Sequence, residues 1–330
     1  MVTPTEHIQA GMEIQADMLI NSILPPNKYD KEKGIVLEEI AQSLARPGTQ
    51  IETDIQSILF DGHSLSLPTL GTYSTIESLP LSPVREYYEG NYIPNNMILS
   101  VIGNFDSADM LEWVKDIYGK PGPGSVFRPQ DSNFETGFTL PSKSSNKLFH
   151  RSHSDTTTLI HLAFDLPSNP APGFFSLMEE LLSEQIEDIQ TNQKNKLSSS
   201  VQSITGQIRQ SPVGNYLLVK ATLNSNENGD ELISFLSAEI SNMKFSMKKD
   251  AISAFASAEK TSFYKSLEKP HMFGIYNAFD LAVSGIDGVL DLPTTEDFNE
   301  AAAALKYYRL KSAPAIMIHH AQNAETAAEV

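Results

Sequence analysis

Apolar residues recur at helical spacing through much of the first sixty residues. The segment 3–24 carries one such stripe, and similar stripes mark about 30–44 and 49–60. Apolar side chains three and four positions apart share one face of a helix, so this pattern predicts three amphipathic helices. The first stripe, expected to be core, consists of Ile8, Met12, Ala16, Leu19 and Ile23.

The run NMILSVIG at residues 96–103 has a different pattern. It is short and almost continuously apolar, which favours a buried strand over a helix. Asp106 or Ser107 is then expected to cap a further helix, which Gly119 closes. The first part of the chain is therefore predicted to combine helices with at least one strand.

Residues 120–147 interrupt this order, because they hold four prolines, several Gly and Ser residues and no helical period. Such a composition is typical of a linker. We therefore expect a first domain over 1–119, a linker over 120–147 and a second domain over 148–330.

The second domain mixes the two periodicities. Residues 156–166 alternate like a strand, 170–190 carry a helical stripe, and the runs 197–209 and 216–224 are strand-like. More helical stripes follow, and the apolar run PAIMIHH forms a last strand near residue 320. Strands joined as hairpins and mixed with helices predict an α+β fold rather than a doubly wound parallel sheet.

Charge and composition exclude several function classes. The formal net charge of −17 repels nucleic acid and anionic membrane surfaces, so neither is an expected partner, whereas basic peptides are weakly favoured. The absence of cysteine excludes disulfides, thiolate zinc sites and cysteine nucleophiles. No apolar stretch is long enough for a membrane span, and acidic residues interrupt the N-terminal apolar run, unlike a signal peptide. A soluble chain without a targeting signal is expected, and its compartment stays open.

The stretch 87–119 resembles the pitrilysin/insulinase-type zinc peptidases, the M16 family. In that family a tyrosine, a proline, an Asn-Met pair, an apolar strand and Gly-x-Phe-Asp precede a helix closed by glycine. The segments PTLGTYSTIESL (68–79) and YDKEKGIVLEEI (29–40) are also similar to family segments, in the same order. The residues that match within the first stretch are Tyr92, Pro94, Asn96, Met97, Gly103, Phe105 and Asp106.

The resemblance implies both a fold and a chemistry. The fold is a tandem of two similar α+β subdomains, with the first subdomain here lacking its N-terminal part. In the complete family, zinc-activated water hydrolyses peptide bonds in a chamber formed by two such tandems. The zinc is held by both histidines of a His-x-x-Glu-His motif and by a distal glutamate on a later helix.

The pair Glu38-Glu39 lies in the segment that resembles this later helix. The alignment places Glu39 at the distal zinc ligand, and its i−4 and i−3 neighbours Ile35 and Val36 put it beside the apolar face. Glu38 remains an alternative ligand, and a solvated helix face without a metal is a further alternative.

The partner motif is missing from this chain. None of its eight histidines forms His-x-x-Glu-His, and the expected position lies upstream of residue 1. Because a lone glutamate cannot hold zinc against water, we expect no bound zinc and no peptide cleavage from the chain as given.

A second departure from the family lies in residues 192–203. Active members carry an arginine and a tyrosine there that bind substrate and stabilise the transition state. The alignment places Gln193 and Ser199 at those positions, and neither arginine nor tyrosine occurs in the segment. Gln lacks the charge that polarises a carbonyl group, and Ser is shorter than a phenol.

The remaining histidines favour structural roles. His150 and His153 are spaced like metal ligands, with His161 nearby, but strand geometry points residues three apart to opposite faces. The adjacent pair His319-His320 diverges for the same reason.

Two functions stay open. One is an incomplete M16-type zinc peptidase that is inactive alone. The other is a non-catalytic peptide-binding or assembly subunit that forms a homo- or heterodimer with another M16-type chain carrying zinc. An unrelated α+β binding protein would require the ordered matches to be coincidence. In either M16 case, the missing N-terminal part should leave apolar surface exposed for a partner to cover.

Overall fold

The structure is a computed structural model that describes residues 1–119, 148–153, 157–168, 170–191, 201–210, 214–223, 229–310 and 314–321. It divides into two compact units, and each unit is assembled from separate stretches of the chain. Unit 1 comprises Met1–Leu37, Tyr73–Phe134 and Ser257–Leu292. Unit 2 comprises Glu38–Thr72, Glu135–Ala256 and Pro293–Val330. The expected linker at 120–147 lies outside the described residues.

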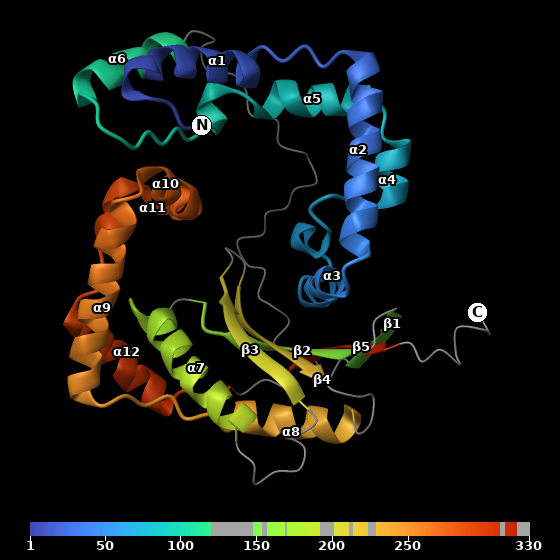
Figure 1. Cartoon of the computed structure of the whole chain (residues 1–330), viewed down its shortest axis with the longest axis vertical. Helices are drawn as coiled ribbons and strands as arrows, with labels where there is room; N and C mark the ends of the chain where they lie inside the picture. Colours follow the sequence, from blue (N-terminus) through green and yellow to red (C-terminus); the bar gives the residue numbers. More distant parts are fainter. Residues whose placement is uncertain are drawn as a thin grey trace. The chain divides into compact units, whose positions relative to one another are not determined.

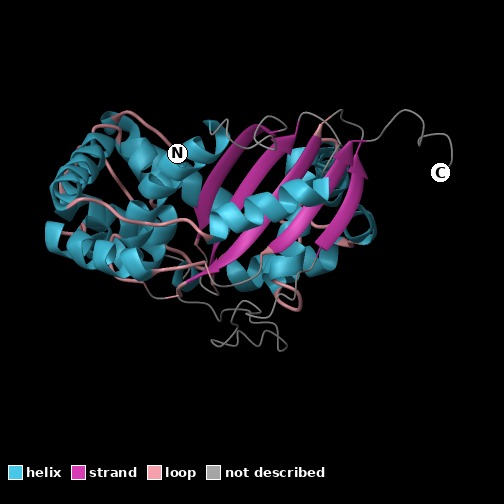
Figure 2. Ribbon diagram, turned by 90° about the horizontal axis from the view of Figure 1, so that it is seen from below, coloured by secondary structure: helices cyan, strands magenta, loops and turns pink. Residues whose placement is uncertain are grey.

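A five-stranded sheet forms the centre of unit 2, with the strand order β1-β5-β2-β4-β3 (Figure 2). The pair β1–β5 is parallel, and the pairs β5–β2, β2–β4 and β4–β3 are antiparallel. This mostly antiparallel sheet among many helices confirms the predicted α+β class. The strands are β1 (Leu148–His153), β2 (Thr158–Leu166), β3 (Val201–Arg209), β4 (Asn215–Leu223) and β5 (Ala315–Ala321).

One face of the sheet packs against helices through the largest apolar core. Alternate residues of β2, namely Ile160, Leu162 and Phe164, contribute fully buried side chains to it. The same core includes residues of α7 (Phe174–Thr191), α8 (Gly229–Ser241), α9 (Lys249–Leu267) and α12 (Thr295–Tyr307). Figure 1 shows α7 and α8 against this side of the sheet. Successive strand residues face opposite sides, so the other face needs a separate cover.

That cover is α3 (Pro47–Leu59), on the opposite side of the sheet from α7 (Figure 1). Its Ile51 and Ile55 are at most 1 % exposed and pack in one core with Ala163, Leu218 and Met317. The helix starts at Pro47, whose missing N–H is harmless in the first turn. The helical stripe predicted over 49–60 is thus confirmed, and its apolar face covers a sheet that lies more than one hundred residues further along the chain.

Unit 1 is helical in the residues that the structure describes. Met12 and Ala16 of α1 pack against Met110 and Ile117 of α6. As predicted, the Asp106 carboxylate caps α6 by accepting hydrogen bonds from the Ala108 and Asp109 amides, at 2.8 and 3.1 Å. The helices of this unit are α1 (Ile8–Ile20), α2 (Pro26–Leu44, which runs on into unit 2), α4 (Tyr73–Ser78), α5 (Leu81–Asn91), α6 (Ser107–Tyr118), the part of α9 from Ser257 on, α10 (Pro270–Tyr276) and α11 (Ala278–Leu290). Short 3-10 turns occur at η1 (Thr5–His7) and η3 (Pro94–Asn96) in unit 1 and at η2 (Ser64–Ser66) in unit 2.

The strand predicted at 96–103 is wrong for this structure. Residues 97–102 are outside any helix or strand, and Ile98 is 65 % exposed. An apolar run becomes a strand only when a neighbouring strand takes up its backbone hydrogen bonds, and the described part of the chain places none beside it.

The first predicted helix is also shorter than expected. It ends at Ile20, and Ile23 lies beyond it with 79 % of its surface exposed, so this residue is not core. The buried members of the stripe are Met12 and Ala16. None of the described helices has the length and apolar character that a membrane crossing requires.

Candidate functional site

The predicted ligands Glu38 and Glu39 lie near the middle of α2, and both side chains are exposed. The neighbouring Ile40 is the buried residue of this helix, whereas Ile35 is 40 % exposed. Glu39 was expected to border the apolar face of the helix, and in the structure both carboxylates are open to solvent.

The residues present do not fit a hydrolytic zinc ion. Such a site needs three protein ligands around the metal. Glu38 and Glu39 diverge by about 100° around the helix, so they cannot both turn to one ion without a distortion. Within the described residues, no three histidine, aspartate or glutamate side chains gather closely enough to hold a metal. No catalytic step through zinc can be derived from this arrangement.

The other predicted site residues are not brought to α2. Gln193 and Ser199 lie outside the described residues. His150 and His153 belong to β1, in parallel register with Ile318 and Ala321 of β5. His161 is 4 % exposed on β2. Residues His319 and His320 form part of β5, as the apolar run predicted.

Unit 1 contains a stretch with open hydrogen-bonding capacity, which we call the 98–104 segment. Within the described structure its backbone amides and carbonyls make no hydrogen bond. Its apolar residues Ile98, Leu99 and Ile102 are 65, 40 and 36 % exposed. A hollow of about 690 Å³ borders the segment, and its lining includes Leu19, Tyr87, Tyr92, Ile98, Val114 and Tyr118. Apolar surface and open backbone groups side by side are features of a site for an added strand.

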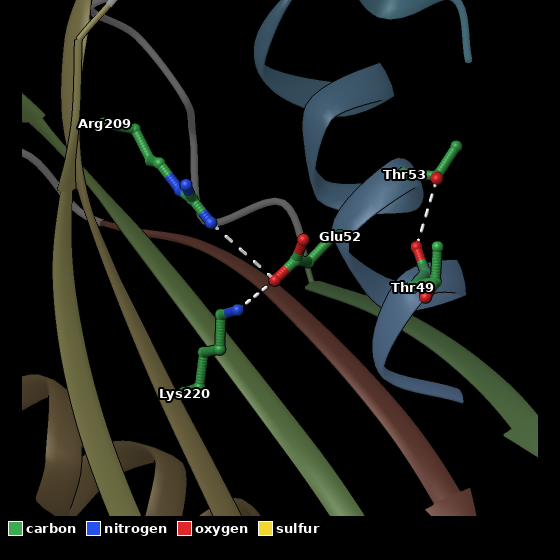
Figure 3. A network of polar contacts seen from close by, with 5 residues as sticks. All are labelled: Thr49, Glu52, Thr53, Arg209 and Lys220. Atoms are coloured by element: carbon green, nitrogen blue, oxygen red, sulfur yellow. Dashed lines mark hydrogen bonds and ion pairs between the residues drawn. The ribbon is translucent and has the colours of Figure 1, made fainter. Parts of the chain in front are cut away.

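Unit 2 contains a polar pocket that we call the α3 pocket. It has a volume of about 310 Å³ and lies where α3 and the chain after it meet β3 and β4. Glu52 of α3 and Arg209 of β3 line it, and Figure 3 shows Glu52 between Arg209 and Lys220 of β4, which is not part of the lining. The rest of the lining consists of Ile55, Gln56, Phe60, Leu65, Gln210, Tyr216 and Leu218.

Both cations, Arg209 and Lys220, lie near the same carboxylate oxygen, Oε1 of Glu52. The Lys220 ammonium contacts Glu52 Oε1 directly, while the Arg209 guanidinium lies 3.9 Å from the same oxygen. An ion pair at this distance and this exposure is weak. Lys220 therefore neutralises Glu52, and within the described residues most of the donor capacity of Arg209 remains available.

Tyr216 adds a hydroxyl group to the α3 pocket. Its ring is 8 % exposed and packs edge-on against Phe60, with ring centroids 6.0 Å apart. Burial raises the pKa of Tyr216 above its ordinary value; Arg209 lowers it and Glu52 raises it by smaller amounts. The hydroxyl is therefore protonated at neutral pH and can donate a hydrogen bond.

Sequence reasoning missed the α3 pocket because its charged lining residues, Glu52 and Arg209, come from two elements far apart in the chain, and the lysine that pairs with Glu52 comes from a third. One local signal was present: Lys220 is a lone charge in the apolar run YLLVKATL at 216–223. A charge in a buried strand needs a partner, but the sequence does not say that the partner is Glu52.

Comparison with known proteins places these features in context. A family model described as the peptidase M16 inactive domain matches residues 78–254. The uncharacterized zinc protease YmxG of Bacillus subtilis is 30 % identical over 128 residues, which are 38 % of this chain and 31 % of that protein. Subunit beta of the mitochondrial-processing peptidase of Blastocladiella emersonii is 26 % identical over 122 residues, 37 % of this chain and 26 % of that protein. The matched stretch thus spans about a quarter to a third of these relatives.

Solved structures support the fold over nearly the whole chain. A protease from Helicobacter pylori superimposes with a TM-score of 0.71 at 13 % identity, covering 96 % of this chain and 77 % of that one. A peptidase M16 inactive domain from Pseudomonas fluorescens gives a TM-score of 0.69 at 11 % identity, covering 98 and 77 %. At such identities the likeness concerns the fold alone.

Proposed function

This chain belongs to the peptidase M16 family, and from this premise we propose that it is a non-catalytic part of a peptide-hydrolysing assembly. In this proposal a second M16-type polypeptide, carrying His-x-x-Glu-His, supplies the zinc site and covers exposed surface of unit 1. The chain would contribute two M16-like subdomains in tandem, over 1–119 and 148–330, and surfaces that hold peptide.

The observation that carries the proposal is the 98–104 segment. Its open backbone groups lie beside exposed apolar side chains, and unpaired backbone groups of this kind accept a strand from another chain. Further apolar residues of unit 1 are exposed as well, among them Ile14 at 61 % and Met18 at 71 %. A large exposed apolar surface is typical of a site for protein association.

The donor residues of this chain agree with a non-catalytic role. The full sequence lacks His-x-x-Glu-His, and the two carboxylates of α2 do not form a ligand set by themselves. Gln193 and Ser199 at the aligned substrate-binding positions point the same way, because neither carries the chemistry of arginine or tyrosine.

A second candidate is a catalytic M16 peptidase in which the motif is supplied by the same polypeptide upstream of residue 1. The observation that favours it is the alignment of Glu39 with the distal ligand, with Glu38 as the alternative. In that case the upstream reading frame encodes His-x-x-Glu-His, and Glu39, now solvated, would become a zinc ligand.

Metal analysis of the purified chain, combined with cleavage of a quenched peptide library, tests the proposal. We expect no stoichiometric zinc and no chelator-sensitive turnover, because one glutamate cannot hold a hydrolytic ion. A zinc endopeptidase of known activity serves as the control that the library can be cleaved. Stoichiometric zinc together with turnover that a chelator abolishes would overturn the non-catalytic assignment.

A further inference from the structure

The α3 pocket combines an available cation with apolar walls. Among the residues that the structure describes, Arg209 has only the distant contact to a shared carboxylate oxygen, and its side chain is 46 % exposed, so its guanidinium can be reached from solvent. Beside it, the apolar part of the lining consists of the partly exposed Leu65 and of Ile55, Phe60 and Leu218, which are at most 2 % exposed. A ligand with a negative charge and a small apolar group would therefore complement both parts of the lining.

We propose that the α3 pocket binds the C-terminal residue of a peptide that ends in an apolar amino acid. In a C-terminal leucine or phenylalanine, the carboxylate and the apolar side chain leave the same carbon atom. This arrangement matches a guanidinium next to an apolar cavity. An aspartate or glutamate side chain offers the charge without an apolar group of its own. The proposal rests on the proposed function only for the choice of a peptide as the source of this carboxylate.

The polar groups around the pocket suit a carboxylate. A guanidinium binds a carboxylate with two parallel hydrogen bonds, which a lysine cannot reproduce. The neutral hydroxyl of Tyr216 and the amide groups of Gln56 and Gln210 are additional donors in the lining. Capture of a terminal carboxylate by a few convergent donors is a known mode of peptide recognition. A volume of about 310 Å³ is small for a ligand site and fits one side chain with its terminal group.

Glu52 then acts as an internal competitor for the ligand. It lines the pocket with the same kind of carboxylate that the ligand would present, and it draws on both cations. Removing its charge should strengthen binding, whereas removing the charge of Arg209 should abolish it. A purely structural role for this ion group predicts no gain of binding from either change.

Fluorescence polarisation with labelled pentapeptides tests the proposal on the purified chain. One peptide ends in a leucine carboxylate, a second in a leucine amide and a third in a glycine carboxylate. We expect the first to bind at least tenfold more tightly than the other two. Arg209→Gln should weaken it at least tenfold, and Glu52→Gln should tighten it severalfold without affecting the amide.

Arg46→Gln is the matched control, because Arg46 is an exposed arginine of unit 2 outside the pocket lining. Circular dichroism and thermal melting of each variant verify folding. Equal binding of acid and amide, equal binding of the leucine and glycine acids, or undiminished binding by Arg209→Gln would each overturn the proposal. The measurement needs neither zinc nor a partner, so its outcome is independent of whether the assembly proposal fails.

Discussion

At the residue scale, the backbone at Gly173 shows how local geometry limits substitution. Its φ is +75°, and a Cβ atom there would lie 2.6 Å from Cε1 of Phe298. That ring is 1 % exposed and packs edge-on against Phe255, so it has little room to move. Gly34, in the middle of α2, has no heavy atom within 4 Å of its Cβ position and no left-handed φ.

These two glycines should respond to alanine with opposite signs. Gly173→Ala combines left-handed strain with overpacking and should lower the free energy of unfolding by about 2–4 kcal/mol. Gly34→Ala should raise it by about 0.5–1 kcal/mol, because alanine favours a helix over glycine. Urea denaturation followed by circular dichroism measures both, and equal stability of Gly173→Ala and the unchanged protein would contradict the expected clash.

The hydroxyl of Tyr308 predicts how stability depends on alkaline pH. Burial, and secondly the charge of Asp165, raise the pKa of Tyr308 to about 12. The unfolded chain loses this proton near pH 10, so the stability from the protonated form is complete below that value and is lost as the pH rises towards about 12.

Tyr308→Phe should therefore reduce the loss of stability between about pH 10 and about pH 12. Tyr307→Phe is the control, since Tyr307 is the neighbouring residue and is 77 % exposed. Thermal melting across this range gives the comparison, and ultraviolet titration of the phenolates should show the latest-titrating tyrosine missing in Tyr308→Phe alone. Identical alkaline profiles for the two variants would argue against the burial effect.

At the element scale, the two apolar runs 96–103 and 156–166 show what makes a strand. Both have the composition of a buried strand, yet only the second becomes one. Within unit 2, β2 pairs with β4 and with β5, and both pairs are antiparallel. No such neighbour lies beside the 98–104 segment in the described structure, so its apolar side chains stay exposed.

If a partner strand covers the 98–104 segment, Ile98→Asp should weaken association at least tenfold, because it would bury a charge in the interface. Leu44→Asp is the control, since Leu44 is exposed to a similar extent, at 53 %, but lies on the part of α2 that belongs to unit 2. Light scattering of the chain alone, and co-purification with an M16-type chain that carries His-x-x-Glu-His, measure association. Amide hydrogen exchange at 98–104 should slow in the complex; unchanged exchange there would exclude this segment as the site of pairing.

At the scale of the whole molecule, the compact units do not follow the order of the chain. The stretch 38–72 packs with the sheet unit, and 257–292 groups with the early helices. Apolar stripes tell which face of a helix is buried, but they do not tell which distant element will cover it. For this reason the stripe of α3 was predicted, whereas its packing against β2, β4 and β5 was not.

For the candidate sites too, some features could be predicted from the sequence and others could not. The match to the M16 family, the missing zinc motif and the position of Glu38 and Glu39 on a helix could be inferred from consecutive residues, because motifs and helix periodicity are local properties. The exposure of both carboxylates could not be inferred in this way, since it depends on which elements pack against α2.

The sequence by itself determined the α+β class, most helices, the strands β2 to β5 of the sheet and the family, because these follow from short-range periodicity and from ordered motifs. Tertiary structure alone decided that Glu52 meets Arg209 and Lys220 beside one pocket, and that residues 98–104 have no neighbouring strand among the described residues. Both outcomes depend on contacts between residues far apart in the chain, and such contacts leave no periodic trace in the sequence.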